Sequence, residues 1–327
     1  MKLIRIARLS LVAFMLTGLV AARPAAAYTF TTIDAPGSVT TLPYGINSAG
    51  ETVGYYQGLS YITHAFLKAS GVGGGYSTFD YPGTVGNTYP SGINDGGKVA
   101  GFYVVSGFAH GFLGVPGSLT PVDQLGATQT IIEGVNNTGQ VAGRITDVSS
   151  NNHGFFTTAG IITDFDVSAA SLTSAEGIND TGQIAGFYLD ASSHPHGFYR
   201  AAATGLITAI DVAGASATEA FGINAAGEIV GYYNDATGTH GFLDNAGIFT
   251  TVDVAGATST VARGINASGQ IVGNYTTTTG VHGFIATPDA SAAPEPSQAA
   301  GLAFAGFVLV ALLLHARSRN THLPKRA

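Results

Sequence analysis

The 327-residue chain contains no cysteine, and charged residues make up only 10% of it. Without cysteine, neither disulfide bonds nor thiolate metal sites can form, so packing and backbone pairing must stabilise the fold, and redox chemistry is not expected. Hydrophobic residues make up 45% of the chain, which also has 46 glycines. This composition is typical of a chain that buries a core rather than of a disordered polymer.

Basic residues are scarce between Tyr28 and Ser297, whereas all 20 acidic residues lie there, which gives this segment a formal charge of −15. Its five basic residues are Lys68, Lys98, Arg144, Arg200 and Arg263. So acidic a segment repels nucleic acid and anionic lipid surfaces. We therefore expect no nucleic-acid partner.

Residues 1–27 have the pattern of a secretory signal peptide. Three basic residues among the first eight precede an apolar run over residues 9–22, and an alanine triplet ends at Ala27. This pattern predicts export and cleavage between Ala27 and Tyr28. An uncleaved membrane anchor is the alternative.

The other end of the chain has a stop-transfer pattern. A linker over residues 288–298 contains Pro294, Glu295 and Pro296, and an apolar segment over residues 299–314 and a basic tail over residues 315–327 follow it. The apolar segment is a little shorter than the roughly 20 residues that cross a bilayer. It predicts a short transmembrane helix whose flanking arginines extend to the interface, with a cytoplasmic tail.

This ending resembles the PEP-CTERM sorting signal of Gram-negative bacteria, in which Pro-Glu-Pro precedes a short transmembrane helix and a basic cluster. The resemblance covers about the last 35 residues, although Ser318, Asn320 and Thr321 interrupt the basic cluster. It implies an exosortase-type processing enzyme as a partner and transient anchoring in the inner membrane. It also implies a final location at the outer surface or in an exopolysaccharide matrix or biofilm.

Six copies of a repeat of about 44 residues occupy residues 28–287. Three markers recur in the same order with spacings of 42–47 residues, namely an aspartate that closes a β-rich run, the asparagine of GIN or GVN, and the histidine of HGF or HAF. They are Asp34, Asp80, Asp123, Asp166, Asp211 and Asp253; Asn47, Asn94, Asn136, Asn179, Asn224 and Asn266; and His64, His110, His153, His196, His240 and His282. Such regularity indicates one supersecondary unit per copy.

Each copy contains four short strand candidates and no helical periodicity. They are the run that ends in GIN, a VG-containing run, the run that begins at HGF and the run that ends in Asp, and an Asn-x-x-Gly turn with a positive-φ glycine joins the first two. Four such strands are typical of a propeller blade, so the six copies predict an all-β, six-bladed β-propeller over residues 28–287. An open β-solenoid is the alternative, but the terminal copies are too regular to be its caps.

The last copy lacks its own Asp-ending strand. Residues 29–34 at the start of the repeat domain have that sequence pattern. We therefore predict that this first strand pairs with the last blade and closes the ring.

The HGF or HAF, GIN and VG markers resemble the HAF-type repeats of extracellular bacterial proteins. The resemblance covers about 260 residues, from Tyr28 to about Thr287. It implies an exported repeat protein, and it contributes no catalytic residues.

The repeated side chains have both chemical and structural interpretations. Six histidines could converge on a metal ion, but residues on the third strand of a blade lie far from the axis. We therefore expect each histidine to hydrogen-bond within or between blades, with the repeated aspartate as one candidate partner. The aspartates could act as paired acids in glycoside hydrolysis, but a catalytic pair breaks symmetry and these recur in every copy. We assign neither set to catalysis or to a metal.

Residues that break the repeat are better candidates for a ligand site. They are Tyr55, Tyr56, Tyr81, Tyr89, Glu133, Arg144, Arg200 with the nearby His194 and His196, and Arg263. The spacings of these residues are not typical of any known kind of site. Tyrosine side chains can stack on sugars, but they are also common in β-strands. No nucleophile elbow, phosphate loop, zinc helix or calcium loop occurs, so no cofactor is expected.

Two hypotheses about function follow. The first is a non-catalytic propeller of the cell surface or exopolysaccharide matrix that binds polysaccharide or envelope proteins. The alternative is a polysaccharide-acting hydrolase or lyase with a site at the mouth of the central channel. An asymmetric acidic pair in one deep channel pocket favours the enzyme, whereas a shallow, near-symmetric channel favours a scaffold.

Overall fold

The computed structural model of the protein describes residues 27–71, 73–84 and 86–289. These residues form 24 β-strands and no helix. Within these ranges, no helix is long and apolar enough to span a bilayer. The predicted Pro-Glu-Pro motif, transmembrane segment and basic tail lie outside the described residues. So does the predicted signal peptide, except for Ala27.

Antiparallel pairing groups the strands into six units of four. Unit 1 comprises β2 (Thr40–Ile46), β3 (Thr52–Gln57), β4 (Thr63–Lys68) and β5 (Tyr76–Phe79), and unit 2 comprises β6 (Thr88–Ile93), β7 (Val99–Val105), β8 (Phe108–Val115) and β9 (Ser118–Pro121). Unit 3 comprises β10 (Gln129–Val135), β11 (Val141–Thr146), β12 (Asn152–Thr158) and β13 (Ile161–Phe165), and unit 4 comprises β14 (Leu172–Ile178), β15 (Ile184–Leu189), β16 (Pro195–Arg200) and β17 (Ile207–Ile210). Unit 5 comprises β18 (Ala217–Ile223), β19 (Ile229–Asn234), β20 (Thr239–Asn245) and β21 (Ile248–Thr251), and unit 6 comprises β22 (Ser259–Ile265), β23 (Ile271–Thr277), β24 (Gly280–Pro288) and β1 (Tyr28–Thr32).

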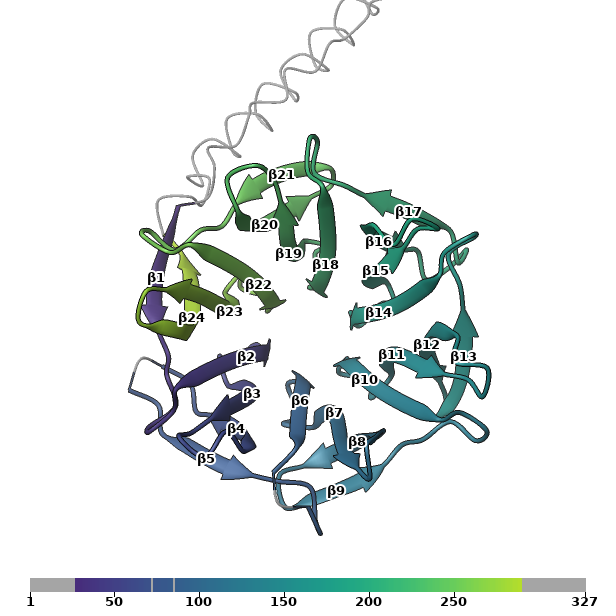
Figure 1. Ribbon diagram of the computed structural model, residues 1–327, viewed down its shortest axis with the longest axis horizontal. Helices are drawn as coiled ribbons and strands as arrows, with labels where there is room; N and C mark the ends of the chain where they lie inside the picture. Colours follow the sequence, from purple (N-terminus) through teal and green to yellow (C-terminus); the bar gives the residue numbers. More distant parts are fainter. Residues whose placement is uncertain (1–26, 72, 85, 290–327) are drawn as a thin grey trace, which may run out of the picture.

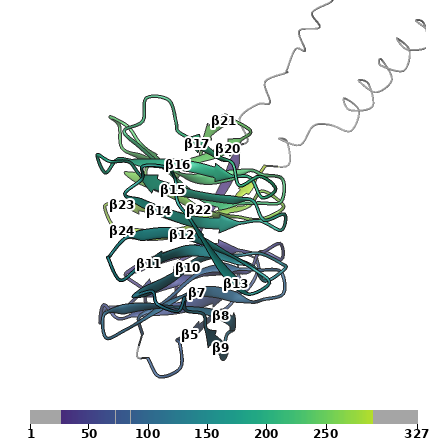
Figure 2. The same ribbon diagram turned by 90° about the vertical axis from the view of Figure 1, so that its right-hand side faces the viewer.

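The units are arranged around a central axis, with the GIN-ending strand of each unit innermost (Figure 1). Figure 2 shows the same ring from the side. In every unit the strand order from the axis outward is the predicted one, so the histidine markers lie on or next to the third strand. This all-β arrangement around an axis is that of a β-propeller.

The predicted pairing of the first strand with the last unit is confirmed. Strand β1 pairs antiparallel with β24, from Tyr28 opposite Pro288 to Thr32 opposite Phe284. The Ile33 N–H then donates to the Gly283 carbonyl at 2.9 Å. The two ends of the repeat domain therefore share one sheet.

The repeated asparagines join neighbouring units. Each side-chain oxygen accepts the backbone N–H four residues later and so stabilises the Asn-x-x-Gly turn, while each Nδ2 donates to the backbone carbonyl of the asparagine in the next unit. The last of these bonds runs from Asn266 to the Asn47 carbonyl, at 3.0 Å. The six bonds form a closed circle, so the junction between units 6 and 1 is bonded like the other five.

The glycine of the GIN marker allows the inner strands to approach one another. A Cβ on Gly45 would lie 2.9 Å from the Gly92 Cα of the next unit, and one on Gly177 would lie 2.4 Å from the Phe221 carbonyl oxygen. Real Cβ atoms do not approach so closely. In each unit the pairing register shifts at the residue before this glycine, so that residue sits in a β-bulge.

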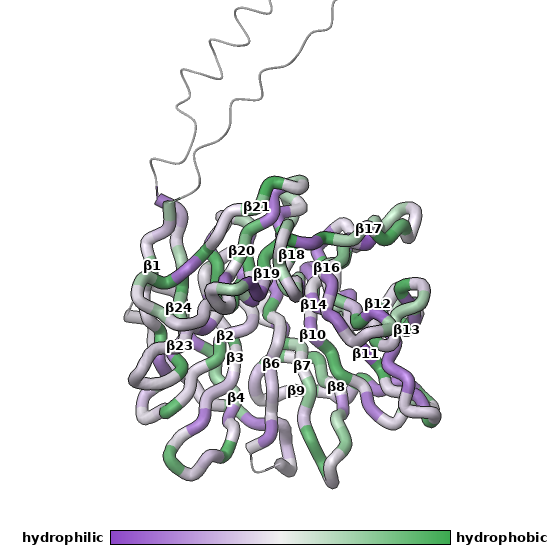
Figure 3. The backbone as a smooth tube through the Cα atoms, turned by 45° about the horizontal axis from the view of Figure 1, so that its top comes forward, coloured by the Kyte–Doolittle hydropathy of each residue, from purple (hydrophilic) through white to green (hydrophobic). Residues whose placement is uncertain are grey.

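The core lies between neighbouring units. The phenylalanine of every HGF or HAF marker is fully buried, at Phe66, Phe112, Phe155, Phe198, Phe242 and Phe284. Ala100 of unit 2, for example, packs with Ile132 and Phe155 of unit 3. Hydrophobic segments occur along strands all around the ring and alternate with hydrophilic ones, as Figure 3 shows. Burial of each phenylalanine stabilises the fold by about 1.5–3 kcal/mol.

The predicted pairing of the histidines with the aspartates is confirmed in all six units. Each imidazole Nδ1 lies 2.6–3.0 Å from a carboxylate oxygen of the Asp marker. In unit 6 the partner of His282 is Asp34 from the start of the domain. These pairs are on the outer part of each unit, so the histidines do not converge at the axis.

Candidate axial binding site

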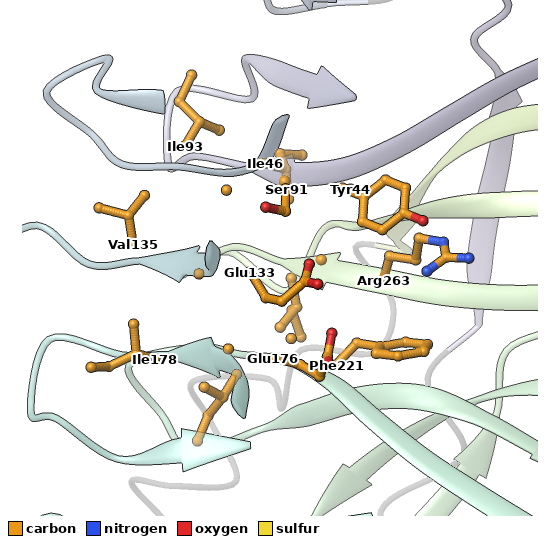
Figure 4. Close-up of a pocket in the computed structure, with 18 residues that line it drawn as sticks. Tyr44, Ile46, Ser91, Ile93, Glu133, Val135, Glu176, Ile178, Phe221 and Arg263 are labelled. Carbon is orange, nitrogen blue, oxygen red and sulfur yellow. The ribbon is translucent and has the colours of Figure 1, made fainter. Parts of the chain in front are cut away.

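The residue in the bulge before the GIN glycine differs in almost every unit. These residues are Tyr44, Ser91, Glu133, Glu176, Phe221 and Arg263. They line the axial channel beside a ring of aliphatic residues (Figure 4). The same aliphatic residues border the asparagines farther along the channel. The repeat therefore builds a regular frame around an irregular centre.

The channel widens on the side of these irregular residues into a cavity of about 340 Å³, which we call the axial pocket. Its walls are formed by the first and second strands of the units. They carry seven aromatic residues, three glutamates and two arginines: Tyr44, Tyr55, Tyr89, Phe102, Phe187, Phe221 and Tyr232; Glu133, Glu176 and Glu219; and Arg144 and Arg263. Pro90 and Ser91 complete the lining. On the other side, the part of the channel between the aliphatic ring and the asparagines encloses only about 90 Å³.

The aromatic residues hold one another and Arg263 in place. The Arg263 guanidinium lies 4.2 Å from the Tyr44 ring centroid and 5.2 Å from that of Phe221, and its Nε donates to Asn274 at 3.0 Å. The Tyr55 ring stacks on Tyr44, with centroids 5.4 Å apart. Such cation–π and stacking contacts fix the walls before any ligand arrives.

Each glutamate of the axial pocket has its own polar partner. Glu133 Oε1 lies 3.7 Å from Arg144 Nη1. Glu176 accepts a hydrogen bond from Ser174 Oγ, and Glu219 accepts one from the Tyr232 hydroxyl at 2.7 Å. The three carboxyl groups are therefore held in different surroundings.

These surroundings separate the acid strengths. Burial, reinforced by the charge of Glu176 and opposed by Arg144 and Arg263, raises the pKa of Glu133 to about 8. Burial also raises the pKa values of Glu176 and Glu219, against the stabilising effects of their hydrogen bonds and of the arginines. A carboxyl group with a raised pKa keeps its proton to a higher pH, and in that form it can donate a hydrogen bond.

Five of the residues singled out by sequence meet in the axial pocket. They are Tyr55, Tyr89, Glu133, Arg144 and Arg263. The other five lie elsewhere: His196 in its pair with Asp211, Tyr56 packed on His64, Tyr81 stacked on Tyr103, Arg200 over Phe156 and Phe165, and His194 near Asp190.

Sequence reasoning missed more than half of the pocket lining. Glu176, Phe221 and Tyr44 were not identified, although each is the residue before a GIN glycine. Aligning the six copies at that position would have revealed them, because its chemistry changes from copy to copy. Within residues 27–71, 73–84 and 86–289, no group of three or more histidines and acids is arranged to hold a metal ion.

Comparison with known proteins supports the fold. No family model and no curated protein sequence matches the chain. A putative TolB from Agrobacterium tumefaciens is similar in structure, with a TM-score of 0.50, 11% identity, and coverage of 77% of this chain and 91% of that one. A protein of unknown function from Bacteroides thetaiotaomicron has a TM-score of 0.50 and 13% identity over 80% of this chain and 76% of that one.

TolB from Acinetobacter baumannii has a TM-score of 0.47 and 11% identity, and the match covers 80% of this chain. The chain spans only 55% of the length of that protein. At such low identities, the two likenesses with a TM-score of 0.50 concern the fold alone.

Proposed function

We propose that this protein is an exported, six-bladed β-propeller that binds a neutral saccharide in its axial pocket without turning it over. The observation that carries this proposal is the axial pocket itself, which concentrates seven aromatic residues and five charged ones at a place where the repeat is irregular. A structural role alone would be served by the same residue in every unit.

The lining suits a sugar ring. Aromatic faces pack against the apolar faces of pyranoses, while carboxyl, guanidinium and phenol groups bond the hydroxyls. The cavity of about 340 Å³ is at the lower end of the usual range for ligands, which fits one sugar residue or the end of a chain.

Charge favours a neutral saccharide. Three glutamates face two guanidiniums in the axial pocket, and burial raises the pKa of each glutamate, so the pocket carries little net charge. The repeat domain around it is strongly acidic and repels polyanions. An acidic polysaccharide is therefore a poor ligand.

The two ends of the chain support the proposed location. The signal-peptide pattern and the Pro-Glu-Pro ending argue for export, handling by an exosortase-type enzyme, and residence at the surface or in the exopolysaccharide matrix of a Gram-negative bacterium. In that setting the saccharide would belong to the matrix, and the propeller would act as a rigid binding module.

A polysaccharide-acting hydrolase or lyase is the second candidate. It is favoured by the asymmetric acids in one channel pocket, where burial and the charge of Glu176 raise the pKa of Glu133. Two neighbouring carboxyl groups with different pKa values are the pairing that general acid–base chemistry uses.

A glycan array with the full chain, followed by turnover assays on the bound glycans, separates the two candidates. Binding without cleavage supports the first, and cleavage that is lost in Glu133→Gln supports the second. For a bound glycan, Tyr55→Ala should weaken affinity by about tenfold or more, equal to about 1.4 kcal/mol. Tyr56→Ala is the matched control, because this neighbouring ring packs on His64 outside the axial pocket. Equal affinities of the two variants would contradict the proposed site.

A further inference from the structure

A second cavity, of about 550 Å³, lies between units 4 and 5, away from the axis. We call it the lateral groove. Unit 4 contributes Tyr199 of β16 and residues 208–211, and unit 5 contributes residues 225–227 of one turn and residues 244–247 at the end of β20 and in the turn that follows it. These two units are neighbours in the ring, as Figure 1 shows. The volume is within the range of small-molecule sites.

One carboxylate in the lateral groove lacks a full set of partners. Asp244 is 6% exposed, and its Oδ1 accepts a hydrogen bond from the Gly247 N–H at 2.7 Å. Among the described residues, no group donates to its second oxygen and no basic side chain lines the groove. A buried carboxylate with a free oxygen is costly unless something pairs with it. Burial accordingly raises the pKa of Asp244.

Aromatic rings flank this carboxylate. Phe249 is directly opposite Asp244 in the pairing of β20 with β21, so their side chains share one face of the sheet. Tyr199, from unit 4, and Phe249 both pack on the hydrophobic cluster that contains Ile210 and Phe242. The groove thus combines Asp244 and a second acid, Asp211, which is paired with His196, with apolar and π surfaces.

The equivalent position in another unit shows what such a groove accommodates. The counterpart of Asp244 in unit 4 is Arg200, because each pairs with the first residue of the second strand. The Arg200 guanidinium lies 4.5 Å from the Phe156 centroid and 5.0 Å from that of Phe165, which are the counterparts of Tyr199 and Ile210.

Unit 1 also has a cation at this position. Lys68 is 2% exposed, and its Nζ donates to the carbonyls of Ala69, at 3.1 Å, and Gly71. Two units therefore bury a cation from the chain where unit 5 has an anion beside an open cavity.

We propose that the lateral groove binds a small primary ammonium ion on an apolar frame. The ammonium donates to the free oxygen of Asp244, and the frame packs between Tyr199 and Phe249. The ammonium group of the ligand thus takes the place that the Arg200 guanidinium occupies in unit 4. Such a site is chemically distinct from the axial pocket, which contains two arginines of its own.

The test uses the full chain labelled with carbon-13 at its alanine methyl groups, titrated with cyclohexylammonium and with cyclohexanol. Ala209, Ala225, Ala226 and Ala246 line the lateral groove, whereas the axial pocket has no alanine in its lining. We expect these four methyl signals to shift when cyclohexylammonium is added. We expect cyclohexanol to bind more weakly, by a factor of about ten or more. Shifts confined to other alanines, equal binding of the two probes, or no binding would overturn the proposal.

Two variants isolate the carboxylate. Asp244→Asn keeps the acceptor for the Gly247 N–H but removes the charge, so we expect cyclohexylammonium binding to weaken about tenfold or more. Asp164→Asn makes the same change at an exposed site in β13 and should bind like the wild type. Wild-type affinity in Asp244→Asn would overturn the proposal, and matching alanine methyl spectra of the free proteins would show that both variants are folded.

Discussion

Replacement of one asparagine at each of two junctions tests whether the ring is closed. Asn266→Ala cuts the bond from unit 6 to unit 1, and Asn136→Ala cuts the corresponding bond from unit 3 to unit 4. Both side chains are almost fully buried and make nearly the same bonds. In a closed ring the two variants should therefore lose the same stability.

The size of the loss follows from those bonds. Asn266→Ala removes the donor to the Asn47 carbonyl, at 3.0 Å, and leaves the Gln270 N–H without its acceptor. A lost bond costs about 0.5–1.5 kcal/mol and an orphaned buried donor about 1–3 kcal/mol, so we expect each variant to lose about 2–4 kcal/mol. Urea unfolding followed by circular dichroism measures this difference. Wild-type stability of Asn266→Ala beside a destabilised Asn136→Ala would refute the reasoning, because it would mean an open junction between the ends of the domain.

Three further predictions concern packing and protonation. Gly177→Ala should destabilise the fold by about 1–3 kcal/mol, because its Cβ would overlap the Phe221 carbonyl, whereas Gly75→Ala has open space and should be neutral in thermal melts. His240→Gln should cost about 0.2–1 kcal/mol in urea unfolding at pH 5.5 and less at pH 8. The hydrogen bond to Asp253 raises the pKa of His240 in the folded state. The contribution of His240 to stability is therefore complete below the pKa of the unfolded state and is lost as pH rises through the pKa of the folded state. An equal loss of stability in His240→Gln at both pH values would contradict this. Finally, the saccharide affinity of the wild type should fall as pH rises through about 8, where Glu133 ionises. The affinity of Glu133→Gln should stay constant from pH 6 to 9. Parallel pH profiles of the two proteins in a binding titration would exclude a role for Glu133 in saccharide binding.

The sequence predicts the frame of the molecule because the frame repeats. Asn47 and His64 each have five counterparts at nearly constant spacing, and a side chain that makes the same local contact six times leaves a periodic pattern. The pairing of β1 with β24 could likewise be predicted, since the last copy lacks one strand and the start of the domain supplies it.

The ligand sites could be predicted only in part because they depend on contacts across the ring. Glu133 and Arg263 are 130 positions apart, and only closure of the ring places both in the axial pocket. Their spacing in the chain carries no signal of this meeting. The lateral groove was missed altogether, since Asp244 is unusual only when compared with Arg200 and Lys68 at the equivalent positions.

The most direct test of the proposed function is to fill the axial pocket and measure saccharide affinity. Ser91→Phe places an aromatic ring at the channel position where unit 5 carries Phe221, and it removes the hydrogen bond from the Ser91 hydroxyl to the Ile132 carbonyl. For a glycan identified on the array, calorimetric titration should show affinity reduced by about tenfold or more, at a temperature where a thermal melt shows that the variant is folded. Undiminished affinity in this variant would contradict binding at the axis.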